Sequence, residues 1–515
     1  MSSTSDPFPP GLEGVRRAEA LALLAAIFLV AACGLIYELL LATISSYLLG
    51  SSVTQFSISV GLFVGSMGIG SWISQRIERR LIGTFVMLEV LLAAVGGFSA
   101  SILFAVYATG VHYYPTLLVF LVVIGAIVGT ELPILVRILN TYGELKTVVA
   151  EALSIDYLGS LAGSILFPLL LLPALGLVRT GFVVGLINVG VATYTLRVFA
   201  RRIRGLPYTV GCAVLALLLG AGALASDHIG NALEQRLYED QIILARSSAY
   251  QRIVFTRWRE DFRLFLDGNL QFASLDEHRY HEALVHPAMS IAGKPSRVLI
   301  LGGGDGLAVR EVLRHPEVEE VVLVDLDPAI TSLAQTFPPL RELNGGVLND
   351  RRVRIVNRDA MSFLQSGSDR FDVVIADLPD PNGEPLAKLY SREFFGLAGR
   401  RLARDGALVT QATSPFFSRR AYWCIERTVA AAGFKTLPYH AQVPSFGDWG
   451  WVLATHFDAD LTQVRIPPGT RYLTPAVLRT LAVFDPDSDR LPAEVSTLDR
   501  PNVLGYYLSS AQSWQ

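Results

Sequence analysis

The chain has 515 residues, of which 51% are hydrophobic and only 17% are charged, and its mean hydropathy is +0.42. This composition is too apolar for one soluble domain, so part of the chain is expected to lie in a lipid bilayer. A formal net charge of −3 argues against nucleic acid as a partner, and three widely separated cysteines predict neither a disulfide framework nor a zinc site.

The apolar residues are concentrated before Ser226, after an N-terminal tail at 1–18 that we expect in the cytoplasm. Each apolar run approaches or exceeds the roughly 20 residues that cross a bilayer. The sequence therefore predicts a multi-pass α-helical membrane domain of about seven helices over 19–226. The runs lie near 19–43, 54–74, 83–107, 115–136, 153–173, 181–199 and 208–226.

Basic residues mark one side of this domain. They precede the first run and follow the second, fourth and sixth runs, as at Arg16, Arg76, Arg137 and Arg201. The positive-inside rule therefore places the N-terminus in the cytoplasm, and an odd number of spans sends the chain after Ser226 to the outer side.

Several acidic residues lie within or beside the runs. Ionisable groups at membrane depth are costly and are candidates for function. One reading is that they pair with neighbouring polar groups or lie at the interface. The other is an acidic path that binds a polyamine cation. The residues are Glu38, Glu89, Glu131, Glu151 and Asp156.

From about residue 237 the composition becomes globular. Runs at 250–256 and 262–266 predict antiparallel strands, and Asp267-Gly268-Asn269 predicts a hairpin turn, so we expect a small β-strand domain at 237–275. The segment 276–287 then leads into a helix. Its histidines and glutamates lack a third ligand at a recognisable spacing, so we expect no metal here, and Tyr280 and His281 are expected to line a pocket.

Residues 297–327 predict a strand, a glycine turn, a helix and a parallel strand, which open a Rossmann-like α/β domain at 276–465. The second strand ends in Asp325, which suits a ribose diol. Asp305 lies inside the glycine turn, where a carboxylate would repel a phosphate, so this turn is suited to a cation. The turn contains Gly302, Gly303, Gly304 and Gly306.

Further strands are predicted at 353–356, 371–376, 407–411 and 447–454. Ligands of such sheets bind beyond the carboxyl ends of the strands, so Asp359, Asp377 and Gln411 are expected at the same crevice as Asp325. Asp359 suits an adenine amino group.

Two acids follow the fourth of the domain's strands in the sequence Asp377-Leu378-Pro379-Asp380-Pro381. The prolines stiffen this turn. A solvated acidic turn is the simpler explanation, but with Asp305 three carboxylates surround one cavity, and such a cavity is suited to a polycation.

These residues also carry a family resemblance. The segments GGGDG, REVLRHP, VDLD, DxxDP, YQ, LDGNLQ, DEHRYHE and VPSFGDWG together resemble polyamine aminopropyltransferases of the spermidine synthase family over roughly 245–460. The first half resembles, more loosely, that of the bacterial integral-membrane members with an N-terminal multi-pass region.

The resemblance implies transfer of an aminopropyl group from decarboxylated S-adenosylmethionine to putrescine or a related diamine, which gives spermidine and methylthioadenosine. Gln251, Asp325 and the Asp359-Ala360 pair would hold the methylthioadenosine part. Tyr280, His281 and Asp305 would surround the aminopropyl and amine groups. Asp377 is the expected proton acceptor, and Asp380 would orient the same amine. No metal or redox cofactor is expected, and family members are commonly homodimers or homotetramers.

The chain departs from the family pattern at five places. Asp325 stands where many members have glutamate, and Ala360 replaces a common glycine. Leu378-Pro379 replaces small hydroxylated residues, and Glu384-Pro385 is shifted by one residue. Phe446 stands where many members have a tyrosine near the far amine of the acceptor, which leaves room for an amine other than putrescine.

Two alternatives stay open. A small-molecule methyltransferase would explain the glycine turn but not the three acids, and a polyamine transporter or sensor with a non-catalytic binding domain would use Glu38, Glu89 and Glu131. The substrates of the enzyme favour a cytoplasmic active site although the charge pattern favours the outside. Residues 466–515 are expected to form a C-terminal helical cap without chemistry of its own.

Overall fold

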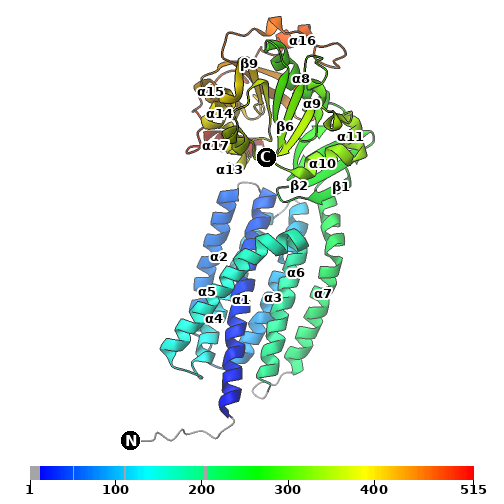
Figure 1. The fold of residues 1–515 in the computed structure, drawn as a ribbon. Coiled ribbons are helices and arrows are strands. Elements are labelled where there is room, and N and C mark those ends of the chain that lie inside the picture. The colour runs from blue at the N-terminus through cyan, green and yellow to red at the C-terminus, as the bar shows by residue number, and fades with distance from the viewer. Residues whose placement is uncertain (1–11, 50–51, 110–111, 201–205, 515) are drawn as a thin grey trace. The chain divides into compact units, whose positions relative to one another are not determined.

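The computed structural model describes residues 12–49, 52–109, 112–200 and 206–514. The chain divides into two compact units, a helical unit up to Glu239 and an α/β unit from Asp240 to the C-terminus (Figure 1).

The helical unit contains six helices in its described residues that are long and apolar enough to cross a membrane. Their sequences are apolar around most of the circumference, which is typical of helices without a water-facing side. The elements are α1 (Leu12–Leu49), α2 (Ser52–Ser74), α3 (Leu81–Ala108), α4 (Tyr113–Leu139), α5 (Leu145–Leu166), a π-helical segment (Phe167–Leu171), α6 (Leu172–Val198) and α7 (Leu206–Gln235).

The stretch Leu145–Val198 counts as one of these six helices because it is helical almost throughout. It spans 54 residues, and an unbroken helix of that length would measure about 80 Å, far more than a hydrocarbon core of about 30 Å. The helix breaks at Gly176, where φ is 70° and ψ is −179°. The two predicted runs at 153–173 and 181–199 therefore lie on opposite sides of one backbone break.

Two helices extend beyond the predicted apolar runs of the helical unit. Helix α1 begins at Leu12 rather than at residue 19, and α7 continues to Gln235, beyond the predicted end at 226. In both places polar residues extend the helix past its apolar run, because helical geometry does not end where hydropathy falls. Residues 1–11 of the predicted tail, and Arg201, lie outside the described residues.

The α/β unit begins with a four-stranded antiparallel sheet in the order β1-β2-β3-β4. Its strands are β1 (Gln241–Ser247), β2 (Arg252–Trp258), β3 (Asp261–Leu266) and β4 (Asn269–Ala273). Asp267 and Gly268 have φ values of 48° and 79°. Two consecutive positive φ angles are typical of the tight hairpin turn that the sequence predicted between β3 and β4.

A seven-stranded sheet follows, in the order β10-β11-β9-β8-β5-β6-β7. The five strands from β9 to β7 are parallel, and β11 and β10 extend the sheet in antiparallel fashion. Strand β10 was not predicted from the sequence. The strands are β5 (Arg297–Gly302), β6 (Glu320–Asp325), β7 (Val353–Asn357), β8 (Phe371–Asp377), β9 (Leu402–Gln411), β10 (Lys435–Val443) and β11 (Gly447–Thr455).

Helices cover both faces of this sheet (Figure 1). Alternate residues of each strand point to opposite faces, so Val298 and Ile300 pack in one core while Leu299 and Leu301 pack in the other. The first core contains α8 (Glu277–Ile291), α9 (Leu307–Val312), α10 (Pro328–Thr336), α11 (Pro338–Leu343) and α16 (Pro475–Thr480); the second contains α12 (Ala360–Ser366), α13 (Glu384–Ala387), α14 (Arg392–Arg401), α15 (Arg419–Ala431) and α17 (Asn502–Trp514).

The C-terminal stretch differs from the predicted helical cap. Only α16 and α17 are α-helical within the described residues 466–514, and most of the rest has no regular secondary structure. The segment is rich in proline and aspartate, which disfavour helix interiors.

Candidate active site

The chain order of the parallel strands reverses between β5 and β8, which lie side by side at the centre of the sheet. Gly302 at the end of β5 pairs with Asp377 at the end of β8. Ligands of doubly wound sheets bind beyond the strand ends at such a reversal. The glycine turn and the Asp377–Asp380 turn therefore meet at the position where a ligand is expected.

The glycines allow these two turns to touch. Gly302 and Gly303 have φ values of 83° and 64°, in the left-handed region that favours glycine. A Cβ atom at Gly302 would overlap the backbone carbonyl oxygen of Asp377, and one at Gly303 would lie 2.9 Å from the Asp377 carboxylate. The glycine turn thus holds its backbone directly against Asp377.

Asp325 closes the other side of the glycine turn. Its carboxylate accepts hydrogen bonds from the backbone N–H of Gly304 at 3.0 Å and of Asp327 at 2.8 Å. Burial raises the pKa of Asp325 to about 6, although these two hydrogen bonds oppose the rise. A carboxylate has about four acceptor positions, so Asp325 can still accept from the hydroxyl groups of a ribose.

Asp377 receives a hydrogen bond from the hydroxyl of Tyr280, at 2.8 Å. Tyr280 lies on α8 and is buried, with a T-shaped contact to Phe446 at a ring-centroid distance of 6.1 Å. Burial raises the pKa of Asp377, whereas the charge of His281 and the Tyr280 hydrogen bond lower it. Burial therefore makes this carboxylate a stronger base than an exposed aspartate, while its two neighbours favour the ionised form.

His281 is oriented by a chain of charged groups. Its Nδ1 lies 2.9 Å from a carboxylate oxygen of Glu277, and Glu277 also accepts two hydrogen bonds from Arg310 at 3.0 and 2.9 Å. Burial lowers the pKa of His281, but the hydrogen bond and charge of Glu277 outweigh it and raise that pKa to about 9. His281 is therefore an imidazolium at neutral pH, with Nε2–H as its remaining donor.

Asp305 lies close enough to His281 and Asp377 for the three charges to interact. Its carboxylate accepts a 2.8 Å hydrogen bond from the backbone N–H of Leu307, which fixes its orientation. Burial raises the pKa of Asp305 to about 6; the charge of His281 opposes this rise and that of Asp377 adds to it.

Asp380 accepts hydrogen bonds from Gln411 at 3.3 Å and Thr413 at 3.4 Å, and from the hydroxyl of Tyr507 on α17. Burial raises its pKa to about 6 against these hydrogen bonds. Tyr507 belongs to the C-terminal stretch, in which the sequence analysis found no chemistry. The sequence did not reveal this contact, because a tyrosine in an apolar helical pattern gives no sign of which distant carboxylate it contacts.

Gln411 was expected to contact substrate, and the structure shows the protein groups that it bonds. It is 1% exposed, and its amide nitrogen donates to the carbonyl oxygen of Leu378 at 2.7 Å and to the hydroxyl of Tyr390. Its amide oxygen accepts from the backbone N–H of Thr413 at 2.8 Å. Gln411 therefore positions the turn between Asp377 and Asp380.

Asp359 also has protein partners. It caps α12 through the backbone N–H of Ser362 at 2.9 Å and forms an ion pair with Lys388 at 2.7 Å. Burial raises the pKa of Asp359, but the bonds to Lys388 and Ser362 outweigh burial and leave that pKa below its usual range. One carboxylate oxygen of Asp359 therefore pairs with the ammonium group of Lys388, whereas the sequence suggested an adenine amino group as the partner of Asp359. Ala360, the first residue of α12, is 7% exposed.

Gln251 lies in the loop between β1 and β2 and donates a 3.0 Å hydrogen bond to Asp327. Asp327 in turn caps α10, two residues beyond Asp325. Gln251 therefore lies at the same strand end as Asp325. Gly306 has a φ of 84° and precedes α9 at the end of the glycine turn.

The remaining acids of α8 hold the helix in place. Glu282 accepts three backbone N–H groups, and Glu277 is bonded to Arg310 and His281. The donors to Glu282 are those of Arg471, Tyr472 and Leu473. Both glutamates therefore have structural partners.

Comparison with known proteins gives one family. The family described as "Spermine/spermidine synthase domain" matches residues 277–464. A polyamine aminopropyltransferase of Leptospira interrogans is 45% identical over 94% of this chain and 98% of its own length. Polyamine aminopropyltransferase 1 of Ralstonia nicotianae is 46% identical over 96% of this chain and 95% of its own, and the Mycobacterium tuberculosis relative is 40% identical over 94% and 95%.

Among solved structures, spermidine synthase from Thermotoga maritima is 26% identical to the chain, with a TM-score of 0.44, and the match covers 48% of this chain and 85% of that one.

Proposed function

The chain belongs to the polyamine aminopropyltransferase family and is an aminopropyltransferase enzyme, and we propose that it transfers an aminopropyl group from decarboxylated S-adenosylmethionine to putrescine, giving spermidine and methylthioadenosine.

The observation that carries this proposal is a set of three carboxylates at the ends of the neighbouring strands β5 and β8. Asp305, Asp377 and Asp380 are each half-buried, and no lysine or arginine of the described residues forms a salt bridge with any of them. His281 offsets only part of their negative charge. Grouped carboxylates in a partly dehydrated site are stabilised by a bound cation, and a diamine supplies two.

Asp305 supports the choice of donor. S-adenosylmethionine carries a carboxylate, which the acid in the glycine turn would repel. Its decarboxylated form has a sulfonium and a terminal ammonium and no anionic group. The ammonium is therefore suited to Asp305, while the ribose is suited to Asp325.

In the proposed reaction, a neutral amine nitrogen of putrescine attacks the aminopropyl carbon that is bonded to sulfur. The new C–N bond forms as the C–S bond breaks, and the electron pair of the C–S bond stays on sulfur, which becomes the neutral thioether of methylthioadenosine. The attacking nitrogen passes a proton to Asp377, which leaves spermidine as the second product.

The site favours this attack in two ways. An aliphatic amine has a pKa of about 10 in water and is mostly protonated at neutral pH, so it needs a base and a dehydrated setting to become a nucleophile. Burial raises the pKa of Asp377, which makes it a better proton acceptor, and the Tyr280 hydrogen bond fixes its direction. Positioning of the two substrates supplies much of the remaining acceleration.

The acceptor is the least constrained part of the proposal. Phe446 packs against Tyr280 and offers no hydroxyl to the far amine. We infer that Asp380, with its partners Thr413 and Tyr507, holds that amine instead. A methyltransferase on the same fold gives the three carboxylates no role and is therefore less well supported.

The six long apolar helices support a location in the cell membrane. We propose that the helical unit crosses the bilayer and anchors the enzyme to it.

A turnover assay tests the proposed substrates. Full-length protein purified in detergent is mixed with decarboxylated S-adenosylmethionine and, separately, diaminopropane, putrescine, cadaverine or spermidine, and methylthioadenosine is measured by mass spectrometry. We expect release that depends on an amine and is fastest with putrescine. Faster release with another amine would overturn putrescine, and methyl transfer from S-adenosylmethionine would overturn the whole proposal.

A further inference from the structure

Two carboxylates lie in the interior of the helical unit without hydrogen-bond partners. Glu89 on α3 and Glu131 on α4 are both 0% exposed, and within the described part of the chain none of their four carboxylate oxygens has a hydrogen-bond partner. The hydroxyl of Tyr37 on α1 is likewise buried and unpartnered among the described residues.

These three groups belong to one cluster. Glu89 and Glu131 interact electrostatically with each other, and both interact with Tyr37. A Cβ atom at Gly96 would overlap the ring of Tyr37, so Tyr37 packs directly on α3. Glu89 and Gly96 are two helical turns apart and share one face of α3. The face of α3 that carries Glu89 is therefore the face that Tyr37 covers.

Such a cluster is unstable unless protons or a bound cation neutralise the carboxylates. An unpaired buried carboxylate costs several kcal/mol, and two adjacent ones repel each other as well. No lysine or arginine in the described residues forms a salt bridge with either glutamate. Ionisable groups at this depth, without a protein partner, are candidates for binding a cation.

The number and type of ligands favour an ammonium group over a metal ion. Hard cations such as Ca²⁺ take six to eight oxygen ligands. The described residues contain no cluster of three or more histidine, cysteine, aspartate or glutamate side chains that could hold a metal. An alkylammonium has three N–H donors and no acceptor. Two carboxylates and a hydroxyl provide one acceptor group for each donor.

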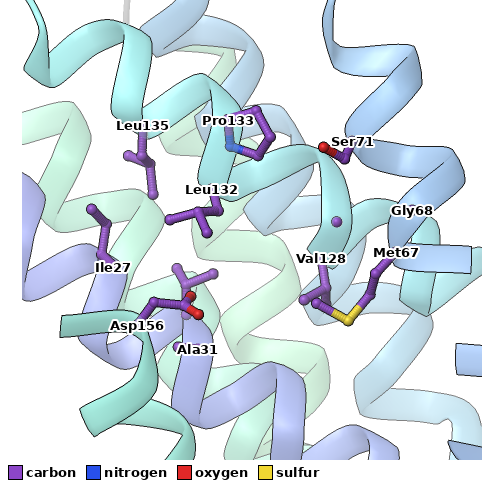
Figure 2. Close-up of a pocket in the computed structure, with 12 residues that line it drawn as sticks. Ile27, Ala31, Met67, Gly68, Ser71, Val128, Leu132, Pro133, Leu135 and Asp156 are labelled. Carbon is purple, nitrogen blue, oxygen red and sulfur yellow. The ribbon is translucent and has the colours of Figure 1, made fainter. Parts of the chain in front are cut away.

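A cavity of the helical unit lies at the level of Glu131 along α4, although Glu89, Glu131 and Tyr37 do not line it. Figure 2 shows it between α1, α2, α4 and α5, with Val128, Leu132 and Leu135 of α4 on its wall. These residues bracket Glu131 along α4, so the cavity reaches the depth of Glu131. Its walls are mostly apolar, which suits methylene groups, and the carboxylate of Asp156 points into it.

The cavity also contains an acceptor from the backbone. Pro133 has no N–H, so the carbonyl of Gly129, four residues earlier on α4, lacks its usual helical donor. Gly129 and Ser71 both line the cavity. The cavity therefore offers an ammonium group a carboxylate, a carbonyl and a hydroxyl.

We propose that Glu89 and Glu131, together with Tyr37, bind the ammonium group of an aliphatic amine, so that the helical unit contains an amine site of its own. The class of ligand rests on the proposed function, because polyamines are the cations on which this enzyme acts. The site is separate from the three aspartates of the α/β unit.

The first test uses the wild-type, full-length protein in detergent. Dicyclohexylcarbodiimide reacts with carboxyl groups in apolar surroundings, and peptide mass spectrometry locates the product. We expect labelling of Glu89 or Glu131 that falls about tenfold with putrescine at ten times its dissociation constant, by mass action. Sodium and tetramethylammonium, which lack N–H donors, should not protect. Equal protection by sodium, or none by any amine, would overturn the proposal.

The second test compares Glu89→Gln and Glu131→Gln with the control Glu144→Gln, which changes an exposed glutamate in the loop before α5. Equilibrium dialysis with radiolabelled putrescine should give two sites per chain in the wild type and in the control, and one in each glutamine variant. Methylthioadenosine release should persist in all four proteins. One site in every protein would overturn this inference, whereas loss of release in the wild type would overturn the proposed function instead.

Discussion

Replacing Tyr280 by phenylalanine removes one hydroxyl, and with it the 2.8 Å hydrogen bond to Asp377. A hydrogen bond to a charged group contributes about 1.5–3 kcal/mol. Because this bond favours the ionised carboxylate, its loss raises the pKa of Asp377 further above its usual range. On the acid side of the pH profile, where activity follows the ionised fraction, kcat/KM for the amine should fall roughly tenfold to hundredfold, since about 1.4 kcal/mol corresponds to a factor of ten.

The assay is a pH profile of kcat/KM for the amine at saturating donor. The acid limb should move to higher pH in Tyr280→Phe, while the plateau at high pH changes much less. Tyr439→Phe is the matched control, because its hydroxyl donates a 2.8 Å hydrogen bond to the carbonyl of Ala283 in the same core and touches no acid. It should lower the stability without moving the limb. An unchanged limb in Tyr280→Phe, or an equal shift in both variants, would refute the proposed role of Tyr280.

Three further predictions follow from the same contacts. Gly303→Ala places a Cβ at a φ of 64° and 2.9 Å from the Asp377 carboxylate, so chemical denaturation should show a loss of at least about 1 kcal/mol and turnover should fall. Lys388→Met removes the partner of Asp359, but the lysine side chain is 37% exposed, so we expect a change in unfolding free energy below about 1 kcal/mol and nearly normal turnover. Burial raises the pKa values of Asp305 and Asp380 to about 6, so the folded chain binds these two protons more tightly than the unfolded chain does. The amine-free protein should therefore lose stability as the pH rises through about 6. Putrescine favours the ionised forms, so thermal denaturation should show its largest increase in Tm above pH 6 and little increase below it.

The part of the site that the sequence predicted is the part encoded in short segments. The glycine turn, Asp305 and Asp325 occupy one strand-turn-helix-strand unit, and the acids at 377 and 380 directly follow a buried strand. The carboxyl ends of parallel strands lie along the same edge of a sheet, so residues that follow neighbouring strands come close together. The prediction therefore needed only the strand pattern and the order of the segments.

The parts that were missed depend on contacts between distant segments. Tyr507 on the last helix forms a hydrogen bond with Asp380, and Lys388, in the segment that follows β8, forms an ion pair with Asp359. Gln411 is at the predicted strand end, and only the packing around it shows that its amide donates to the Leu378 carbonyl. Periodicity places a residue on a strand or helix, and it does not reveal which distant group satisfies its hydrogen bonds.

In the helical unit, too, the sequence predicted the elements but not the contacts between them. Hydropathy identified the apolar runs, while the break that separates two of them depends on the backbone conformation of Gly176. The sequence also marked Glu89 and Glu131 as unusual, but their lack of partners is visible only after the helices are packed.

The most direct measurement compares Asp377→Asn with the control Asp458→Asn, which changes an aspartate that is 92% exposed and forms an ion pair with Lys435. Binding of decarboxylated S-adenosylmethionine is measured by calorimetry, and a single turnover with putrescine is followed by methylthioadenosine release. We predict unchanged donor affinity in both variants and a rate at least about a hundredfold lower in Asp377→Asn alone, the size expected for loss of a general base. A normal rate in Asp377→Asn, or an equal loss in the two variants, would contradict proton acceptance by Asp377.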